Sequence, residues 1–211
     1  MILNEKLKVY LDYLLKLDPD GTEELYSYLV ENKFPVVGRD TAKFLSQIVM
    51  IKQPDKILEI GTNVGFSALT MARVLRKGMI YTLDYREDLQ NQALENFKKF
   101  NVEDKIKLIN GRAEKMLFRI DEKFDIIFID ADKRGYPLYL DYAIEHINSD
   151  GIILVDNLFW KGSVYSPESF DPPKAAVPTL QEFNKRFSKL NGFKSQLLAL
   201  GDGLGIAVKM D

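Results

Sequence analysis

Two aspartates stand at the ends of two short apolar segments, FDIIFID and GIILVD. Asp130 closes the first segment, and Asp156, followed directly by Asn157, closes the second. If these segments are neighbouring strands, their ends lie ~4.8 Å apart, and two carboxylates that close need a cation or a proton between them. With Asn157 they form a set of hard oxygen ligands that suits Mg²⁺, or alternatively Mn²⁺ or Ca²⁺. Either aspartate alone would more commonly cap a helix, but the pair with Asn157 favours a metal site.

Lys133 follows Asp130 by three residues, on the loop that leaves the same segment. Most lysines are solvated surface charges, and Asp132 could pair with this one at the surface. Beside a divalent cation, however, an ammonium group is disfavoured, so Lys133 is a candidate base for a phenolic proton. A substrate with vicinal hydroxyls would fill coordination positions that the protein leaves open on the cation.

The segment ILEIGTNVGFS, residues 57–67, is predicted to be a strand that runs through a glycine turn into a helix. Gly61 and Gly65 allow a ligand to approach the backbone closely at the carboxyl end of the strand. A dinucleotide-binding motif, G-x-G-x-x-G, would have its second glycine where Asn63 stands, and no G-K-[ST] of a P-loop follows. The turn therefore favours a nucleoside without a pyrophosphate, and S-adenosylmethionine fits that description.

Other residues extend this candidate nucleoside site. Asp84 ends the next predicted strand, 23 residues after Gly61, where an acidic side chain can accept hydrogen bonds from both ribose hydroxyls. A cationic sulfonium tolerates a nearby carboxylate such as Glu59, whereas a pyrophosphate would be repelled. Gly111 and Ala113, after the third predicted strand, could border an adenine face, although that stretch taken alone indicates only the start of a helix.

Alternating strands and helices must position these residues. From Lys56 onward the predicted strands are 57–60, 79–84, 106–110, 124–130 and 151–156, and the predicted helices are 65–76, 86–100, 112–119 and 136–147. Short, almost wholly apolar strands are typical of a parallel sheet covered on both faces, and the alternation gives right-handed βαβ units. A helix at 177–190 and two strands, 193–200 and 204–210, follow; the strands flank Gly201-Asp202-Gly203, so at least one late strand should run antiparallel. We expect an α/β, doubly wound, Rossmann-like sheet.

The first 53 residues are predicted to be a helical extension. Helices are expected at 3–17, at 22–32 with Thr22 as N-cap, and from about Asp40. The whole chain, 1–211, is then one domain, with N-terminal helices in 1–53 and the core in 54–211. The two N-terminal helices carry more apolar positions than a lone extension can bury, so we expect them to pack on the core or across a homodimer interface.

The composition excludes several classes of protein. The 211 residues are 46% hydrophobic and 28% charged, without a run of ~18 apolar residues and without a signal-peptide core, so we expect a cytoplasmic protein with no membrane association. The absence of Cys and the single His146 exclude thiolate zinc sites, Cys nucleophiles and His-rich metal sites. The net charge of −2 argues mildly against binding to nucleic acid.

Four motifs, ILEIGTNVGFSAL, YTLDY, FIDADK and VDNLFWKGSV, resemble in order and spacing the cation-dependent O-methyltransferases, the family of caffeoyl-CoA and catechol O-methyltransferases. The resemblance runs from about Phe34 to the C-terminal GDGLGIAV. It implies a seven-stranded sheet in the order 3-2-1-4-5-7-6 with strand 7 antiparallel, in agreement with the hairpin inferred above.

The resemblance also implies roles for individual residues. It places S-adenosylmethionine against Glu59, Gly61, Ser67, Asp84, Ala113 and Asp130, the cation on Asp130, Asp156 and Asn157, and the base at Lys133. The glycine turn adds Asn63 and Gly65 as candidate cofactor-binding residues. Asn63 and Phe66 depart from the residues that many members carry, which should alter packing around the methionine end. Family members build part of the acceptor pocket from the segment that is 158–178 here, with Trp160, Tyr165, Phe170, Pro172 and Pro173.

The predicted function is that of an S-adenosylmethionine-dependent, divalent-cation-dependent O-methyltransferase that acts on a small phenolic acceptor, catechol-like or otherwise vicinally dihydroxylated. The cation would stabilise the phenolate, and Lys133 would assist deprotonation. The main alternative acceptor is a hydroxylated uridine of tRNA, methylated by a bacterial branch of the same fold and disfavoured by the acidity of the chain. A non-catalytic adenosylmethionine-binding protein and a dehydrogenase are the remaining alternatives; the intact set of four polar residues argues against the first, and the missing glycine against the second.

Overall fold

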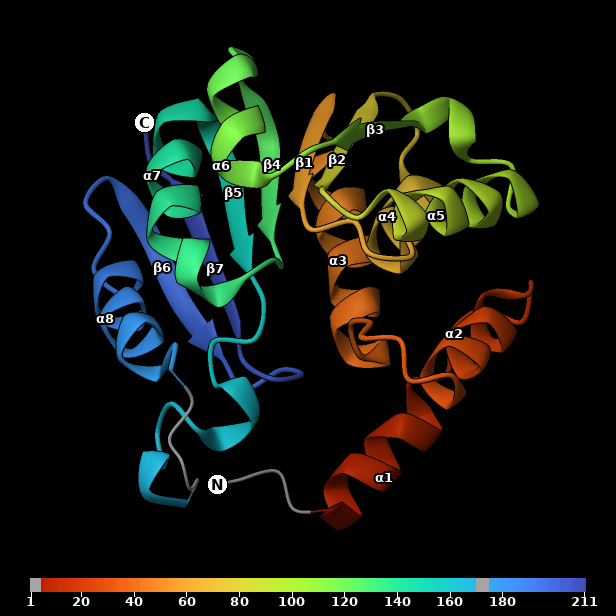
Figure 1. Ribbon diagram of the computed structural model, residues 1–211, viewed down its shortest axis with the longest axis horizontal. Coiled ribbons are helices and arrows are strands. Elements are labelled where there is room, and N and C mark those ends of the chain that lie inside the picture. The colour runs from red at the N-terminus through yellow and green to blue at the C-terminus, as the bar shows by residue number, and fades with distance from the viewer. Residues whose placement is uncertain (1–4, 170–174) are drawn as a thin grey trace.

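A single mixed sheet forms the centre of the computed structural model, which describes residues 5–169 and 175–211 (Figure 1). Its seven strands lie in the order β3-β2-β1-β4-β5-β7-β6. The first five strands are parallel where they pair, and β7 runs antiparallel to both β5 and β6. The predicted strand order and the antiparallel last hairpin are therefore confirmed. The strands are β1 Lys56–Ile60, β2 Met79–Asp84, β3 Ile106–Asn110, β4 Phe124–Ile129, β5 Ile147–Val155, β6 Phe193–Leu198 and β7 Leu204–Lys209.

Helices cover both faces of this sheet. On one face, α2, α3, α4 and α5 pack over the strands, and on the other α6, α7 and α8 do so. Among the described residues the helices are α1 Glu5–Leu14, α2 Thr22–Glu31, α3 Arg39–Lys52, α4 Phe66–Val74, α5 Glu87–Lys99, α6 Ala113–Met116, α7 Tyr136–His146 and α8 Val177–Phe187. None of the helices in this part of the chain has the length and apolarity that crossing a membrane requires.

The central strand β4 is apolar at almost every position because it is covered on both faces of the sheet. Ile126 and Phe128 point into the core beneath α3 to α5, whereas Ile127 and Ile129 point into the core beneath α7 and α8. All four side chains are fully buried. Because successive side chains of a strand face opposite sides, a strand covered on both faces needs apolar residues at every position.

Several element boundaries differ from the predictions. β5 begins at Ile147, directly after α7, and not at Gly151. Its pairing with β4 is irregular there, since Phe124 pairs with Ile147 but Ile126 pairs with Ile152. The polar sequence NSDG, residues 148–151, bulges out of the ladder and therefore resembled a turn. The predicted helix 112–119 divides into α6 and a 3₁₀ turn at Leu117–Arg119.

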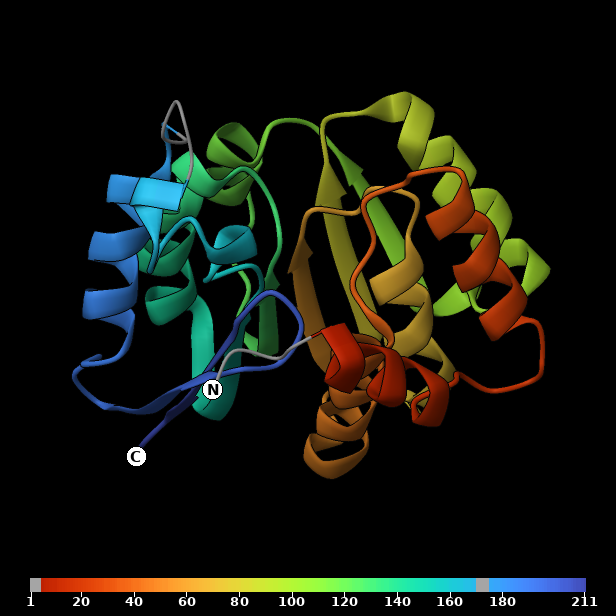
Figure 2. The same cartoon turned by 90° about the horizontal axis from the view of Figure 1, so that it is seen from below.

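The N-terminal helices differ in how they are covered. α2 and α3 pack on the core through Leu25, Leu29 and Leu45, while α1 leaves several large apolar side chains exposed. The prediction of Thr22 as N-cap is wrong: Thr22 is the first helical residue, and its backbone N–H donates to Oδ1 of Asp20 at 3.1 Å. Viewed from below, the N-terminal helices and the loop between β6 and β7 lie on the side to which the parallel strands point (Figure 2).

Candidate active site

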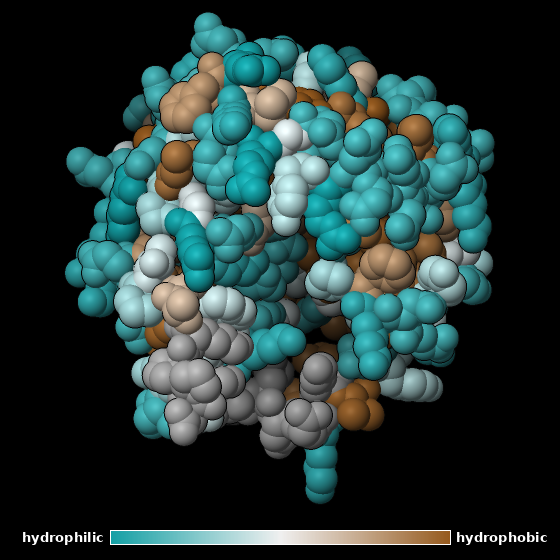
Figure 3. All heavy atoms as spheres, in the orientation of Figure 1, coloured by the Kyte–Doolittle hydropathy of each residue, from teal (hydrophilic) through white to brown (hydrophobic). Residues whose placement is uncertain are grey.

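A cavity of about 2160 Å³ opens at the carboxyl edge of the parallel strands. Its walls come from the ends of β1, β2, β4 and β5, from the segment 34–41 that precedes and begins α3, and from the loop after β5. The space-filling view shows a hollow below the centre of this face (Figure 3). Since a pocket for a single small ligand usually has ~300–1000 Å³, this cavity has room for two ligands side by side.

Most of the predicted cofactor-binding residues line this cavity. Glu59 and Gly65 do not reach it: Glu59 is fully buried between the sheet and α4, and a Cβ on Gly65 would lie 2.5 Å from the ring of Phe97. The six that line it are Gly61, Asn63, Ser67, Asp84, Ala113 and Asp130. The structure thus brings together six of the eight residues, and places the other two directly behind the wall.

Gly61 is required where β1 and β4 come close together. Its φ is +111°, and a Cβ added there would lie 2.0 Å from the carbonyl oxygen of Asp130. The contact is fixed on both sides, because the N–H of Gly61 donates to Leu83 O at 2.8 Å and that of Asp130 donates to Ile60 O at 2.9 Å. Only a glycine allows the chain to turn at this point and leave the cavity open.

The carboxylate of Asp84 is held at the margin of the cavity by two backbone N–H groups. Oδ2 accepts from Asn63 at 2.9 Å, and Oδ1 accepts from Arg86 at 3.0 Å. Asn63 has a φ of 48° and donates its side-chain N–H to the carbonyl oxygen of Pro35 at 2.7 Å. This bond ties the glycine turn to the segment before α3. The cavity wall is therefore built from two parts of the chain that are far apart in sequence.

Glu59 is the centre of a buried hydrogen-bond network. Ser67 Oγ donates to one carboxyl oxygen at 2.5 Å, and Thr82 Oγ1 donates to the other. The hydroxyls of Thr82 and Thr62 are also 2.8 Å apart. Burial, against the opposing effect of the two hydroxyl donors, raises the pKa of Glu59 to about 8. Glu59 thus reaches the cavity directly through Ser67 and, one hydroxyl further on, through Thr82 and Thr62; Ser67 and Thr62 both line the cavity.

Asp130 and Asp156 follow neighbouring parallel strands, as predicted, since Ile129 of β4 pairs with Val155 of β5. Asp156 is buried, and this burial, reinforced by the charge of Asp130, raises the pKa of Asp156 well above its usual range. The next helical turns are preceded by Asp132 and Phe159, so neither aspartate is a helix cap. Two carboxylates in this position repel each other unless a positive charge lies between them.

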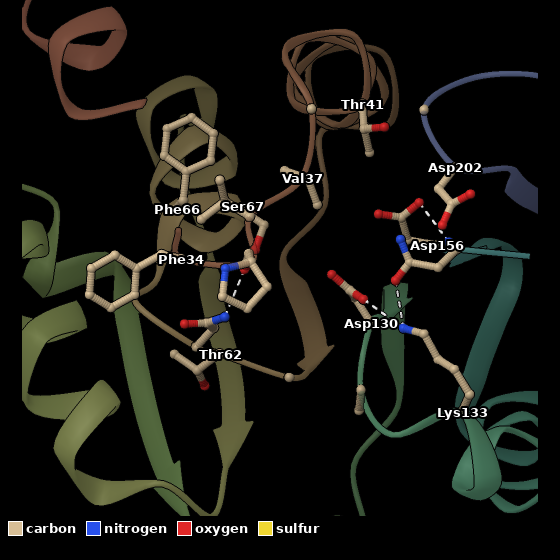
Figure 4. Close-up of a pocket in the computed structure, with 18 of the residues that line it drawn as sticks. Phe34, Val37, Thr41, Thr62, Phe66, Ser67, Asp130, Lys133, Asp156 and Asp202 are labelled. Carbon is tan, nitrogen blue, oxygen red and sulfur yellow. Dashed lines mark hydrogen bonds and ion pairs between the residues drawn. The ribbon is translucent and has the colours of Figure 1, made fainter. Parts of the chain in front are cut away.

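The ammonium group of Lys133 supplies such a charge. Its Nζ donates to Oδ1 of Asp130 at 3.1 Å and to Oδ1 of Asn157 at 2.6 Å (Figure 4). The surface pairing with Asp132 that the sequence left open is therefore replaced by a pairing inside the cavity. All four predicted metal-site and base residues, Asp130, Lys133, Asp156 and Asn157, come together.

These residues fit a hard divalent cation. Within residues 5–169 and 175–211 no cluster of three or more His, Cys, Asp or Glu side chains with metal-ligand spacing occurs. Asp130, Asp156 and Asn157 provide two carboxylates and one amide oxygen. Such a donor set is typical of Mg²⁺ sites that keep water or substrate oxygens as further ligands. The buried Asp156 carboxylate is the observation that favours a cation here.

Tyr136 supports this site from behind and was not predicted from the sequence. Its ring is fully buried, its hydroxyl donates to the carbonyl oxygen of Asp156 at 2.9 Å, and Nζ of Lys133 lies 5.0 Å from the centre of its ring. Such a cation–π contact stabilises the ammonium position. The available signal was the spacing in DADKRGY, which places a tyrosine one helical turn after the lysine.

The hairpin loop between β6 and β7 also shapes the cavity. Asp202 accepts hydrogen bonds from the N–H of Phe159, through its carbonyl oxygen at 2.9 Å, and of Lys161, through Oδ1 at 2.6 Å. The N–H of Gly201 donates to Oδ2 of Asp40, at the start of α3, at 2.8 Å. The loop thus connects α3 to the loop after β5.

The predicted acceptor segment lies in this region. Trp160 and Tyr165 line the cavity, as do Phe159, Lys161 and Gly162. Phe170, Pro172 and Pro173, which were predicted to contribute, lie outside the described residues. Val37 and Thr41 also line the cavity (Figure 4) and were not predicted from the sequence. The break at Phe34-Pro35 was the one signal that the chain leaves a helix here.

The fold and the cavity together define a class of protein, the doubly wound α/β enzymes that bind a nucleoside-containing ligand at the carboxyl edge of the sheet. A sequence model of the O-methyltransferase family matches residues 19–210, and the chain belongs to this family.

Two relatives and a solved structure extend the comparison. The chain is 31% identical to tapetum-specific methyltransferase 1 of Arabidopsis thaliana, over 93% of this chain and 86% of that protein. It is 29% identical to a catechol O-methyltransferase of Niastella koreensis, over 97% and 96% of the two chains. It is also similar to the crystal structure of an O-methyltransferase from Bacillus cereus in complex with SAH, with a TM-score of 0.82, 29% identity and 97% of each chain covered.

Proposed function

We propose that this O-methyltransferase transfers the methyl group of S-adenosylmethionine to a hydroxyl oxygen of a small phenolic acceptor that carries two vicinal hydroxyls, with the help of a divalent cation. The observation that carries the proposal is the meeting of Asp130, Asp156, Asn157 and Lys133 in the same cavity as the glycine turn. The similarity to a catechol O-methyltransferase supports the acceptor class.

The donor half of the cavity suits S-adenosylmethionine. Asp84 offers a carboxylate to the ribose hydroxyls, and Gly61 allows the backbone to approach the ligand. Ala113 adds a small residue to the wall after β3. The similarity to a solved structure that contains SAH supports this assignment. A methyl group then moves from sulfur to oxygen: the C–O bond forms as the C–S bond breaks, and S-adenosylhomocysteine leaves.

The acceptor half contains the charged groups. Asp130, Asp156 and Asn157 would hold Mg²⁺, or alternatively Mn²⁺ or Ca²⁺, and the bound cation would supply stabilisation of the negative charge on the phenolate. Lys133 lies at hydrogen-bond distance from two of these three residues. A bound cation would disfavour its ammonium form, and the neutral amine would then be placed to take the proton of an acceptor hydroxyl. Trp160 and Tyr165 provide aromatic surface for a planar acceptor.

Methyl transfer to a panel of catechols, before and after treatment with EDTA, tests the cation. We expect removal of metal to abolish transfer and added Mg²⁺ to restore it. Asp156→Ala should lower kcat/KM by at least ~100-fold, because several kcal/mol of charge stabilisation would be lost, and should weaken metal binding in calorimetry. Asp104→Ala, at an exposed position outside the cavity, is the matched control.

The same assay separates the alternatives. Full activity after metal removal, or in Asp156→Ala, would contradict the cation role and leave the methyltransferase assignment in place. Methylation of tRNA but of no catechol, with salt-sensitive tRNA binding, would instead favour the hydroxyuridine acceptor.

A further inference from the structure

A carboxyl group with no access to solvent lies one hydroxyl away from the donor half of the cavity. Glu59 is 0% exposed, and Ser67, 8% exposed, separates it from the cavity. Thr82 binds the other carboxyl oxygen and has no exposed surface. Ser67 is therefore the shortest hydrogen-bonded link from Glu59 to a ligand, since the other link passes through both Thr82 and Thr62.

Ser67 occupies the first turn of α4, directly after the left-handed Gly65. The first turn of a helix carries free N–H groups and a partial positive charge, which favour an anionic group. S-adenosylmethionine has a single anionic group, the carboxylate of its methionine part. If the proposed function is correct, this carboxylate is the ligand group that a hydroxyl donor at Ser67 would bind.

Counting protons shows that Ser67 cannot always act as that donor. A serine hydroxyl has one proton to donate, and an ionised carboxylate only accepts. When Glu59 is ionised, Ser67 and Thr82 both donate to it, and Ser67 presents only lone pairs to the cavity. When Glu59 is neutral, its acid O–H can donate to Ser67 Oγ across the same 2.5 Å contact. The proton of Ser67 is then free to point into the cavity.

We propose that Glu59 is a positioning residue whose proton makes Ser67 a hydrogen-bond donor to the carboxylate of S-adenosylmethionine. The inference rests on the proposed function, because it concerns the binding of that ligand. Glu59 itself does not touch the ligand. It determines in which direction the Ser67 hydroxyl donates.

The surroundings of Glu59 favour the neutral form. From β2, Thr82 and the carboxylate of Asp84 at the end of the strand face Glu59. From β4 come the apolar Phe128 and, after the strand, the carboxylate of Asp130. α4 contributes Ser67. Both carboxylates oppose ionisation, as does burial, which is the largest effect and raises the pKa of Glu59 to about 8. The neutral form therefore prevails below pH 8, and ligand affinity should fall as the pH rises through this value.

Calorimetric titration with S-adenosylhomocysteine between pH 6.5 and 9.5 tests the inference. The affinity of the unmodified protein should fall about tenfold over this range, the size of effect expected from losing one hydrogen bond to a charged group. Glu59→Gln, whose amide can donate to Ser67 at every pH, should lose this dependence. Comparing the two proteins at each pH removes the contribution of the ligand's own amino group, which is common to both.

Adenosine provides a control that requires no variant. It lacks the carboxylate, so its affinity should stay constant between pH 6.5 and 9.5. Ser67→Ala should bind S-adenosylhomocysteine more weakly at pH 7 and, like Glu59→Gln, keep only the pH dependence that comes from the ligand's own amino group. This keeps the inference testable if the glutamine variant does not fold.

The outcomes distinguish this inference from the proposed function. A constant affinity ratio between the unmodified protein and Glu59→Gln across the pH range would overturn the role of Glu59 while leaving ligand binding intact. An equal fall in affinity for adenosine would overturn it as well. If the unmodified protein did not bind S-adenosylhomocysteine even at pH 7, the proposed function would fail together with the inference.

Discussion

Lys133 lies where three different interactions meet. Its ammonium group donates to Asp130 and to Asn157 and stands over the ring of Tyr136. Its side chain is 13% exposed, so water competes weakly for these contacts. A lysine that is held in this way has little rotational freedom, which favours proton transfer to or from a ligand in a single orientation.

Replacing Lys133 tests the assignment of the base. We expect Lys133→Ala to lower kcat by about 100-fold, the contribution commonly made by a positioned acid or base, and to leave the affinity for S-adenosylhomocysteine within about twofold. The measurements are steady-state kinetics with a catechol acceptor and calorimetry. Lys98→Ala, on the exposed surface of α5, is the control and should retain full activity.

An unchanged kcat in Lys133→Ala would remove the base assignment while leaving the fold and the metal site untouched. A loss of cofactor affinity as large as the loss of kcat would show instead that Lys133 organises the cavity as a whole.

At the level of single residues, the four charged and polar residues of the candidate metal site were predicted from the sequence, but the direction of Glu59 was not. The types and spacing of Asp130, Lys133, Asp156 and Asn157 predicted that these four would meet, and they do. Glu59 was predicted to face the cofactor but points under α4, on the same face of the sheet as Ile57. The period of two along a strand gives this face, since residues 57 and 59 share it; the close approach of Glu59 to Ser67 depends on packing that the pattern does not contain.

The turns that connect the strands and helices contain glycines with positive φ, and one of these turns shapes the cavity. Gly61 and Gly192 both have positive φ, +111° and +78°, but differ in their surroundings. An added Cβ at residue 61 meets the backbone of Asp130 at 2.0 Å, whereas nothing lies within 4 Å of one at residue 192. Comparing alanine substitutions at these two glycines therefore separates two free-energy costs: that of a left-handed backbone with a Cβ, and that of a steric clash with the neighbouring backbone.

Gly192→Ala should destabilise the protein by about 1 kcal/mol, the usual cost of placing a Cβ in a left-handed conformation. Gly61→Ala should cost more than ~3 kcal/mol, because the backbone oxygen of Asp130 cannot move without separating β1 from β4. Urea unfolding followed by circular dichroism measures both. Equal losses in the two variants would contradict the close approach at Gly61.

The elements themselves could be predicted where the pattern is strong. β4 was found as a run of apolar residues, and the late hairpin was found from Gly201 and Gly203. The start of β5 was missed because its residues 148–151 are polar and bulged, and Ile147 is the one described residue before Ile152 that pairs with the backbone of β4. Residues that are part of a strand only because of their tertiary surroundings lack the alternating or apolar pattern by which a strand is predicted from sequence.

The surface of the whole molecule carries an uneven distribution of apolar side chains. Val9, Tyr10, Tyr13 and Leu14 on α1 are 54–71% exposed. Among the described side chains of α1, Leu11 and Asp12 line the rim of the cavity, and Leu15 lines it directly after the helix. An exposed apolar face of this kind is typical of a surface that another chain covers, so the homodimer stays our prediction.

Light scattering at micromolar concentration should therefore give a dimer of the 24.2 kDa chain. Tyr13→Glu, which places a charge on this face, should shift the mass towards the monomer. Phe118→Glu replaces an equally exposed aromatic residue, 79% accessible and far from α1 in sequence, and should have no effect. A monomeric unmodified protein would contradict the prediction, and an equal response to both substitutions would place the interface elsewhere.

The bond between Gly201 and Asp40 joins residues 161 positions apart in the sequence. During synthesis the strands β1, β2 and β4, which carry the proposed donor half of the cavity, emerge before the β6–β7 hairpin that fixes the loop bearing Trp160. A contact that spans so much chain carries a large loop-closure entropy, and its C-terminal partner is synthesised last. A growing chain therefore acquires the architecture for holding the nucleoside before it can place the molecule to be methylated, and the enzyme is complete only when its last two strands have folded.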